Sequence, residues 1–161
     1  MTNRNKPPSG VLKPVLKVPG AVYRAHLGWL FGHRLLMLRH KGRVTGLVHD
    51  TPLEVMHYDR AADESYVMSG WGRQSAWFRN LEAGGALEVW TGRGRYVPQH
   101  RVVAAEEALG LMRSYVADNR MAAKFIGKWL GYDFAKVGEI ERMVEELPMV
   151  AFRPKAGTGA N

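Results

Sequence analysis

The sequence predicts a small α+β domain built around an antiparallel, barrel-like sheet. Three observations support this prediction. Strand-like segments recur through the first two thirds of the chain, one short helix interrupts them, and helical segments follow toward the C-terminal end. The length of 161 residues suits a single domain with its own core, and the sequence contains neither an internal repeat nor a domain linker.

The strand predictions come from apolar runs and apolar–polar alternation bounded by glycines and polar turns. The run 34–40 lies between Gly32 and Gly42 and suits a strand buried on both faces, whereas 51–58 alternates as a half-buried strand does. The segment Gly92-Arg93-Gly94 predicts the turn of a hairpin. The predicted strands cover residues 34–40, 51–58, 66–70, 86–91, 95–104 and 149–153.

Five helices are expected between and after these strands. One begins near Pro19, because proline suits the first turn of a helix, and a short one follows Ser75, which can cap it. Residues 105–118 and 120–130 have helical composition. From Asp133 to Leu147, apolar residues recur every three or four positions, which predicts an amphipathic helix starting at Asp133.

The ends of the chain have the composition of unstructured segments. We expect a flexible basic arm over residues 1–18, one barrel-like domain over 19–153 and a disordered tail over 154–161. No apolar run reaches the roughly 20 residues of a membrane-spanning helix, and the first residues lack a signal-peptide core. The absence of cysteine excludes disulfides, thiolate catalysis and cysteine-ligated metals, and it fits a cytoplasmic protein.

The net charge of +8 is concentrated in the first third of the chain. Residues 1–49 contain nine lysines and arginines and no acidic residue, since the first acid is Asp50. Such asymmetry indicates an anionic partner, whether nucleic acid, a lipid surface or a phosphorylated small molecule, and solubilising surface charge is the alternative. No nucleic-acid reader motif is present, so we expect no nucleic-acid partner. A peripheral contact with the inner face of the cell membrane through the basic N-terminal segment stays open.

The stretch HKGRVTGLVHDTPL, residues 40–53, places Lys41, Arg43 and two histidines around two glycines. A glycine turn exposes backbone N–H groups, and neighbouring cations add charge, which is how phosphates are held. The stretch matches neither a Walker loop nor a dinucleotide fingerprint. The alternative interpretation is an exposed basic hairpin.

The stretch SGWGRQSAWFRNL, residues 69–81, is the second candidate. Its glycines permit close approach of the backbone to a ligand, and Trp71 and Trp77 offer flat apolar walls. Ser69, Arg73 and Asn80 are polar groups that can fix a ligand. For Trp77 we favour a place in the core.

Other catalytic classes find little support in the sequence. His26, His33 and His40 are seven residues apart, but Gly32 interrupts any common helix and no acid lies near them, so we expect no metal site. A serine-hydrolase elbow is absent, and Glu106 and Glu107 suit the first turn of a helix.

Two motifs, taken together, resemble the deazaflavin-dependent nitroreductase family of actinobacteria. They are Gly42-Arg43-Val44-Thr45-Gly46 with Pro52-Leu53, and Ser69-Gly70-Trp71-Gly72 followed by Trp77-Phe78-Arg79-Asn80-Leu81. The resemblance covers roughly residues 20–153. It implies a split β-barrel similar to that of pyridoxamine-phosphate oxidases, and binding of the deazaflavin coenzyme F-420, which carries a phosphate, a carboxylate and a polyglutamate tail.

The resemblance also implies roles for individual residues. Arg43, Thr45 and His49 would face the phosphate, Thr51, Pro52 and Leu53 would line the cofactor edge, and Ser69, Trp77 and Asn80 would lie near the ring. The chain departs from relatives at Val44, His49 and Gly70, and Lys41 or Arg73 can compensate for the missing cations. Ser69 and Tyr132 are the predicted proton donors. The full cofactor-binding prediction is Lys41, Arg43, Thr45, His49, Thr51, Pro52, Leu53, Ser69, Gly70, Trp71, Trp77 and Asn80.

The function implied is that of an oxidoreductase that transfers a hydride from reduced coenzyme F-420 to a conjugated acceptor such as a quinone or a nitro compound. Two alternatives stay open: an oxidoreductase that uses FMN instead, and a non-enzymatic binder of lipid or another hydrophobic ligand on the same barrel. We expect a monomer or a homodimer.

Overall fold

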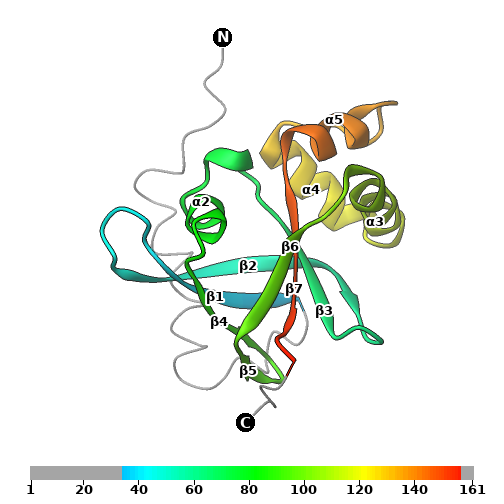
Figure 1. The fold of residues 1–161 in the computed structure, drawn as a ribbon. Helices are drawn as coiled ribbons and strands as arrows, with labels where there is room; N and C mark the ends of the chain where they lie inside the picture. The colour runs from blue at the N-terminus through cyan, green and yellow to red at the C-terminus, as the bar shows by residue number, and fades with distance from the viewer. Residues whose placement is uncertain (1–33, 157–161) are drawn as a thin grey trace.

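A computed structural model describes residues 34–156 of the chain (Figure 1). The strands form one seven-stranded antiparallel sheet in the order β5-β4-β1-β2-β3-β7-β6. The strands are β1 (Leu35–Lys41), β2 (Val48–Asp59), β3 (Glu64–Met68), β4 (Ala86–Thr91), β5 (Gly94–Tyr96), β6 (Pro98–Val102) and β7 (Met149–Pro154). The helices are η2 (Gly72–Gln74), α2 (Ala76–Glu82), α3 (Ala105–Asp118), α4 (Arg120–Leu130) and α5 (Glu139–Glu146).

The sheet curls into a nearly closed barrel. Its two outermost strands, β5 and β6, are consecutive in the chain and are separated by Val97 alone. The chain therefore steps directly from one edge of the sheet to the other, and the Lys155 N–H donates to the Val97 carbonyl at 3.0 Å beside this step. The predicted α+β barrel with peripheral helices is confirmed.

The inside of the barrel is filled by branched and aromatic side chains. In β1, Leu36 and Leu38 face the interior, as the period of two in a strand requires, and they pair in register with Leu53 and Thr51 of β2. Helix α2 closes one side of this core with Trp77, Phe78 and Leu81. The barrel core comprises Leu36, Leu38, Leu53, Val67, Trp77, Phe78, Leu81, Val89, Val150 and Phe152.

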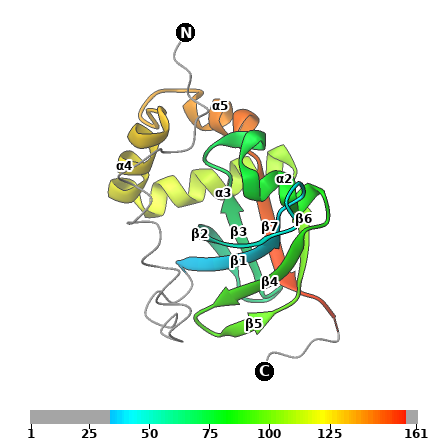
Figure 2. The ribbon, with the colours of Figure 1, turned by 90° about the vertical axis from the view of Figure 1, so that its left-hand side faces the viewer.

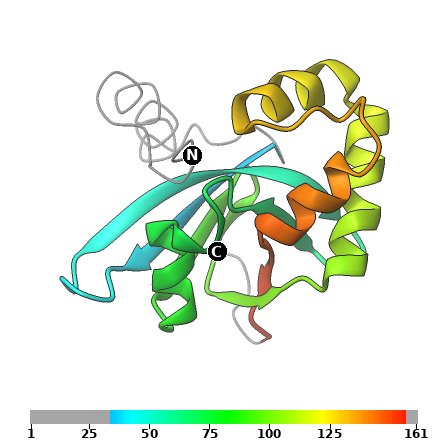
Figure 3. The same cartoon turned by 90° about the horizontal axis from the view of Figure 1, so that it is seen from above.

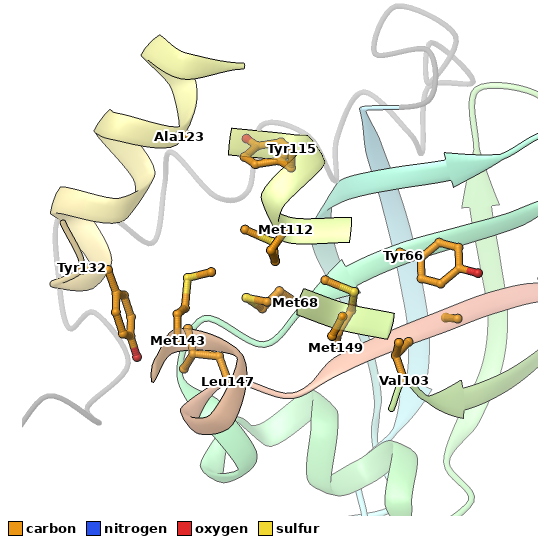
Figure 4. Close-up of a cluster of buried hydrophobic side chains, with 12 residues drawn as sticks. Tyr66, Met68, Val103, Met112, Tyr115, Ala123, Tyr132, Met143, Leu147 and Met149 are labelled. Carbon is orange, nitrogen blue, oxygen red and sulfur yellow. The ribbon is translucent and has the colours of Figure 1, made fainter. Parts of the chain in front are cut away.

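A second core lies between the barrel and helices α3, α4 and α5 (Figure 4). Figure 4 shows that α3 directs Met112 and α5 directs Met143 toward Met68 and Met149, which come from strands of the sheet. Four buried methionines make this core adaptable, because the thioether chain is unbranched and fills irregular gaps. We call this cluster the methionine core.

The elements divide between two ends of the molecule. Figure 3 shows the β1–β2 hairpin and α2 on one side, and α3, α4 and α5 on the other. In Figure 2 these three helices gather above one end of the strands. We call the first side the hairpin end and the second the helical end.

The structure corrects three local predictions. The helix expected from Asp133 begins only at Glu139, because residues 133–138 form turns: the Asp133 carboxylate accepts from Ala135 N–H, and Gly138 has a left-handed φ of 85°. The strand expected over 95–104 divides into β5 and β6 at the edge of the sheet. Ser75 occupies the N-cap of α2, but its hydroxyl makes no capping hydrogen bond.

Most of the two predicted terminal segments lies outside the described residues. Strand β7 includes Pro154, which was expected to begin the disordered tail. The predicted basic arm and the helix near Pro19 lie outside the described residues. Between residues 34 and 156, no helix is long and apolar enough to cross a membrane.

Candidate functional site

At the hairpin end the inner row of side chains changes from apolar to polar. Along β1 this row runs Leu36, Leu38 and His40, and along β2 it runs Leu53 and Thr51. The His40 ring Nε2 lies 2.9 Å from the Thr51 hydroxyl. The barrel core therefore ends in a polar pair, the buried His40 and the half-buried Thr51, instead of another apolar layer.

Asn80 of α2 joins this pair to the hairpin loop. Its side chain is only 4% exposed, and its Oδ1 accepts from both the backbone N–H and the Nη1 of Arg43, each at 3.1 Å. Because a backbone N–H can only donate, the oxygen of the amide faces Arg43 and Nδ2 donates to His40 Nδ1 at 3.0 Å. His40 then carries its proton on Nε2 and donates it to Thr51.

His40 is a neutral member of this chain of hydrogen bonds. It is 2% exposed, and burial lowers its pKa to about 4, with a smaller lowering from the neighbouring His49 and an opposing effect of Asp50. At neutral pH His40 therefore adds no positive charge to the hairpin end, and it holds Asn80 in place.

Glycines allow these groups to approach one another closely. A Cβ on Gly42 would lie 2.9 Å from the Thr45 hydroxyl and 3.2 Å from His49 Nε2, so both side chains converge on this backbone position. A Cβ on Gly85 would lie 2.6 Å from the Lys41 carbonyl oxygen, and the Lys41 N–H donates to the Gly85 carbonyl at 2.8 Å. The turn after α2 thus fastens the helix to the base of the hairpin.

The cations of the hairpin loop face solvent without an acidic neighbour. Lys41, Arg43, Thr45 and His49 are exposed, and over residues 34–156 no carboxylate forms an ion pair with Lys41 or Arg43. The nearest acid in sequence, Asp50, is held by Arg39 through two hydrogen bonds of 2.8 and 3.1 Å. We call His40, Lys41, Arg43, Thr45, His49, Thr51 and Asn80 the hairpin site.

The other predicted residues lie elsewhere. Trp77 and Leu53 are 5% and 7% exposed and belong to the barrel core, so in this structure they support the site from below. Pro52 is half-buried and pairs with Met37 in the sheet. None of the three presents a free surface like that of Lys41 or Arg43.

The loop that contains Ser69, Gly70 and Trp71 faces the helical end. A Cβ on Gly70 would lie 3.2 Å from Leu130 of α4, and the Trp71 ring packs edge-on against Trp129 at 5.8 Å. Ser69 is fully buried: its hydroxyl donates to the Gly72 carbonyl at 2.7 Å and lies 2.6 Å from the Ser75 hydroxyl. This explains why Ser75 does not cap α2.

Tyr132 lies at the helical end as well. Its hydroxyl donates to Glu146 Oε2 at 2.6 Å, and the Arg142 guanidinium lies 4.7 Å from its ring centre. It lines a cavity of about 660 Å³ between α4 and the chain that follows it. The lining residues are Val116, Arg120, Ala123, Lys124, Lys128, Tyr132, Asp133, Phe134 and Ala135.

The structure therefore distributes the predicted site residues among the hairpin site, the barrel core and the helical end. Sequence reasoning placed Arg43 and Asn80 in one site, and the structure brings them into contact. It did not include His40 or Gly85. The signal for His40 was its position two residues after Leu38 on the inner face of the same strand. Among the residues the structure describes, no group of three histidine or acidic side chains is arranged to hold a metal ion.

Comparisons with known proteins place the chain by its fold. No family model matches the sequence, and no curated protein matches it. The chain is similar to an F420-H2-dependent reductase (FDR-A), at 12% identity and a TM-score of 0.48, over 74% of this chain and 94% of that one. It is also similar to a structure described as a domain-swapped dimer, at 12% identity and a TM-score of 0.51, over 88% and 100% of the two chains.

A third solved structure is a pyridoxamine 5′-phosphate oxidase-related, FMN-binding protein from Nostoc punctiforme. It is 10% identical, with a TM-score of 0.45, over 90% of this chain and 81% of that one. Identities this low concern the fold alone, and the barrel topology described above is what the chain shares with such proteins.

Proposed function

We propose that this chain is a deazaflavin-dependent oxidoreductase whose hairpin site binds the phosphate and acidic tail of coenzyme F-420. The observation that carries the proposal is the contact between Arg43 and Asn80. The two motifs of the family resemblance, 37 residues apart in sequence, meet through two hydrogen bonds of 3.1 Å. Because the two motifs form one polar site, binding of a single ligand would explain why both occur in the same chain.

The charges of the hairpin site fit a polyanion. With Nη1 bound to Asn80, the guanidinium of Arg43 is oriented and keeps other N–H groups for a ligand. Lys41 is exposed and adds a second cation. FMN has a phosphate but no acidic tail, so the acid-free run of 49 residues favours the deazaflavin coenzyme.

The chemistry follows from this class of cofactor. When bound, reduced coenzyme F-420 supplies a hydride, and a quinone that takes the hydride and one proton becomes a hydroquinone. The chain's task is to bind and orient, and its hairpin site does so through fixed donors. Ser69 and Tyr132 stay predictions as proton donors, and their bonds to Gly72 and Glu146 favour a packing role for both.

A turnover assay tests the proposal. Under anaerobic conditions, the purified chain should catalyse oxidation of reduced coenzyme F-420 by a short-chain quinone or a nitroaromatic compound, measured from the return of the oxidised coenzyme's absorbance. Reduced FMN is the parallel arm. Turnover with FMN alone would replace the cofactor and keep the fold, and turnover with neither would contradict the proposal.

The second candidate function is a binder of a hydrophobic ligand. The 660 Å³ cavity beside Tyr132 and Phe134 favours it, because drug-sized apolar ligands occupy cavities of this size. A fatty-acid displacement assay on the purified chain distinguishes it from the enzyme. The oligomeric state, monomer or homodimer, stays a prediction that light scattering decides.

A further inference from the structure

Helix α4 presents a row of large apolar side chains to solvent. Met121, Phe125 and Trp129 are spaced by four residues and therefore share one face of the helix. They are 88%, 77% and 55% exposed, and the Trp129 ring also packs edge-on against Trp71. Three such side chains in a row form a contiguous apolar stripe, and stripes of this kind mark interaction surfaces.

The orientation of α4 is fixed by its other face. Ala123 is 1% exposed and belongs to the methionine core, and Gly127 is buried against the Phe134 ring, where a Cβ would lie 2.7 Å from the nearest ring carbon. No side chain larger than hydrogen fits at Gly127. The stripe therefore points outward because the helix already packs through its opposite side.

The charges beside the stripe are all positive. Each residue of the stripe is preceded in sequence by a basic residue, namely Arg120, Lys124 or Lys128. The 11 residues of α4 contain no acid. The neighbouring α5 is acidic by contrast, with four glutamates in its sequence EIERMVEE. An apolar stripe flanked by cations is the composition of a helix that lies in the interface of an anionic bilayer.

Two alternative occupants of this surface carry like charge. A second copy packed by two-fold symmetry, α4 against α4, would place the cations of its own α4 against those of the first. Residues 1–33 of the same chain contain Arg4, Lys6, Lys13, Lys17 and Arg24 and no acid. An anionic lipid surface supplies both the apolar layer for the stripe and the negative headgroups for the cations.

From this complementarity we infer that α4 is a docking surface for an anionic lipid bilayer. Met121, Phe125 and Trp129 enter the interface, while Arg120, Lys124 and Lys128 contact the headgroups. The inference does not depend on the cofactor proposed above, and it assigns the membrane contact to a described helix instead of the N-terminal arm.

A site-specific label gives the sharpest test, because the chain contains no cysteine. Full-length Phe125→Cys carries an environment-sensitive fluorophore, and Leu87→Cys on β4 is the matched control. With vesicles of phosphatidylcholine and phosphatidylglycerol, we expect a blue shift and a gain in intensity at position 125 and none at 87. Sedimentation with these vesicles and an unchanged label at 125 would overturn the inference, as would failure to sediment with them.

Affinity measurements test the two components of the surface. In vesicle co-sedimentation, Met121→Ser/Phe125→Ser should bind about tenfold more weakly or worse, while Leu87→Ser/Val97→Ser matches the parent. The affinity of Lys124→Gln/Lys128→Gln for the vesicles should fall about fivefold per charge removed, and that of Arg60→Gln/Arg79→Gln should fall little. Equal binding of the α4 variants and their controls would contradict the inference. All the variants replace exposed or partly exposed side chains, so circular dichroism should show the parent's fold.

Discussion

The two ends of the molecule use their polar side chains in opposite ways. At the hairpin end, half-buried Thr51 joins buried His40 and Asn80 in a chain of hydrogen bonds that ends at an exposed, oriented Arg43. At the helical end, the hydroxyls of Ser69 and Tyr132 bond to other groups of the chain. Membership of a sequence motif therefore does not determine what a polar side chain does. The hydrogen bonds of the hairpin end leave N–H donors of Arg43 for a ligand, whereas those of the helical end stabilise the fold.

The hydrophobic cores beneath the two ends differ in rigidity. The barrel core under the hairpin site consists of branched and aromatic side chains, which have few rotamers and hold a site rigidly. The methionine core under the helical end repacks more readily. We expect the hairpin end to be preorganised and the helical end to adapt to what it contacts.

The largest expected effect is the loss of stability when a cavity is made in the barrel core. Phe78 of α2 is fully buried in the barrel core, so Phe78→Ala should lower the free energy of unfolding by about 3–5 kcal/mol, measured by urea denaturation. In the methionine core, Met112→Leu conserves volume and should cost less than about 1.5 kcal/mol. A loss below about 1.5 kcal/mol for Phe78→Ala would contradict a tightly packed barrel core.

The next effect concerns pH. Because burial lowers the pKa of His40 from 6.5 to about 4, the unfolded chain binds a proton that the folded chain does not in this window. The contribution of neutral His40 to the free energy of unfolding is complete above pH 6.5, and up to about 3 kcal/mol of it is lost as the pH falls toward 4. Urea denaturation between pH 7 and 4 measures this loss. In His40→Gln the free energy of unfolding should fall less steeply with pH, whereas equal pH dependence of parent and variant would show that His40 is not its cause.

A smaller effect separates ligand binding from folding. Arg43→Ala removes the cation that we propose to hold the phosphate, so the dissociation constant of coenzyme F-420 should rise about tenfold to a hundredfold. The thermal unfolding midpoint should change little because Arg43 is exposed. Arg60→Ala, on the turn after β2, is the control with the same loss of charge.

The smallest effect is expected at the helical end. Tyr132→Phe removes the hydrogen bond to Glu146 and should lower the free energy of unfolding by about 1 kcal/mol. Single-turnover hydride transfer should stay within about threefold of the parent. A loss of about a hundredfold is the size expected for a general acid, and it would assign the proton transfer to Tyr132.

The sequence predicted the order of the elements well because alternation and helical periodicity are local signals. The strand over residues 34–40 and the helices over 105–118 and 120–130 agree with β1, α3 and α4 to within a residue. The helix from Asp133 was wrong because its apolar period continues through turns that Gly138 ends. The division of 95–104 depends on closure of the sheet, which is a long-range property.

The sequence predicted those site residues whose role can be inferred from residue type and motif, and it missed those whose role depends on contacts between distant segments. Arg43 and Asn80 emerged from their motifs, but the role of His40 depends on Asn80, 40 residues later in the chain. The stripe on α4 was also missed, because composition cannot tell which side of an amphipathic helix packs on the domain. The burial of Ala123 and the contact between Gly127 and Phe134 fix that orientation.

The most direct test of the central claim is a fluorescence titration of coenzyme F-420 with the parent chain, Arg43→Ala and Asn80→Ala, beside FMN. We predict saturable binding to the parent at micromolar concentration or tighter, on the order of −8 kcal/mol. Both variants should bind at least about tenfold more weakly, and FMN should bind the parent more weakly than coenzyme F-420. Equal affinity of the parent and both variants, or tighter binding of FMN, would contradict the claim that the hairpin site holds this coenzyme.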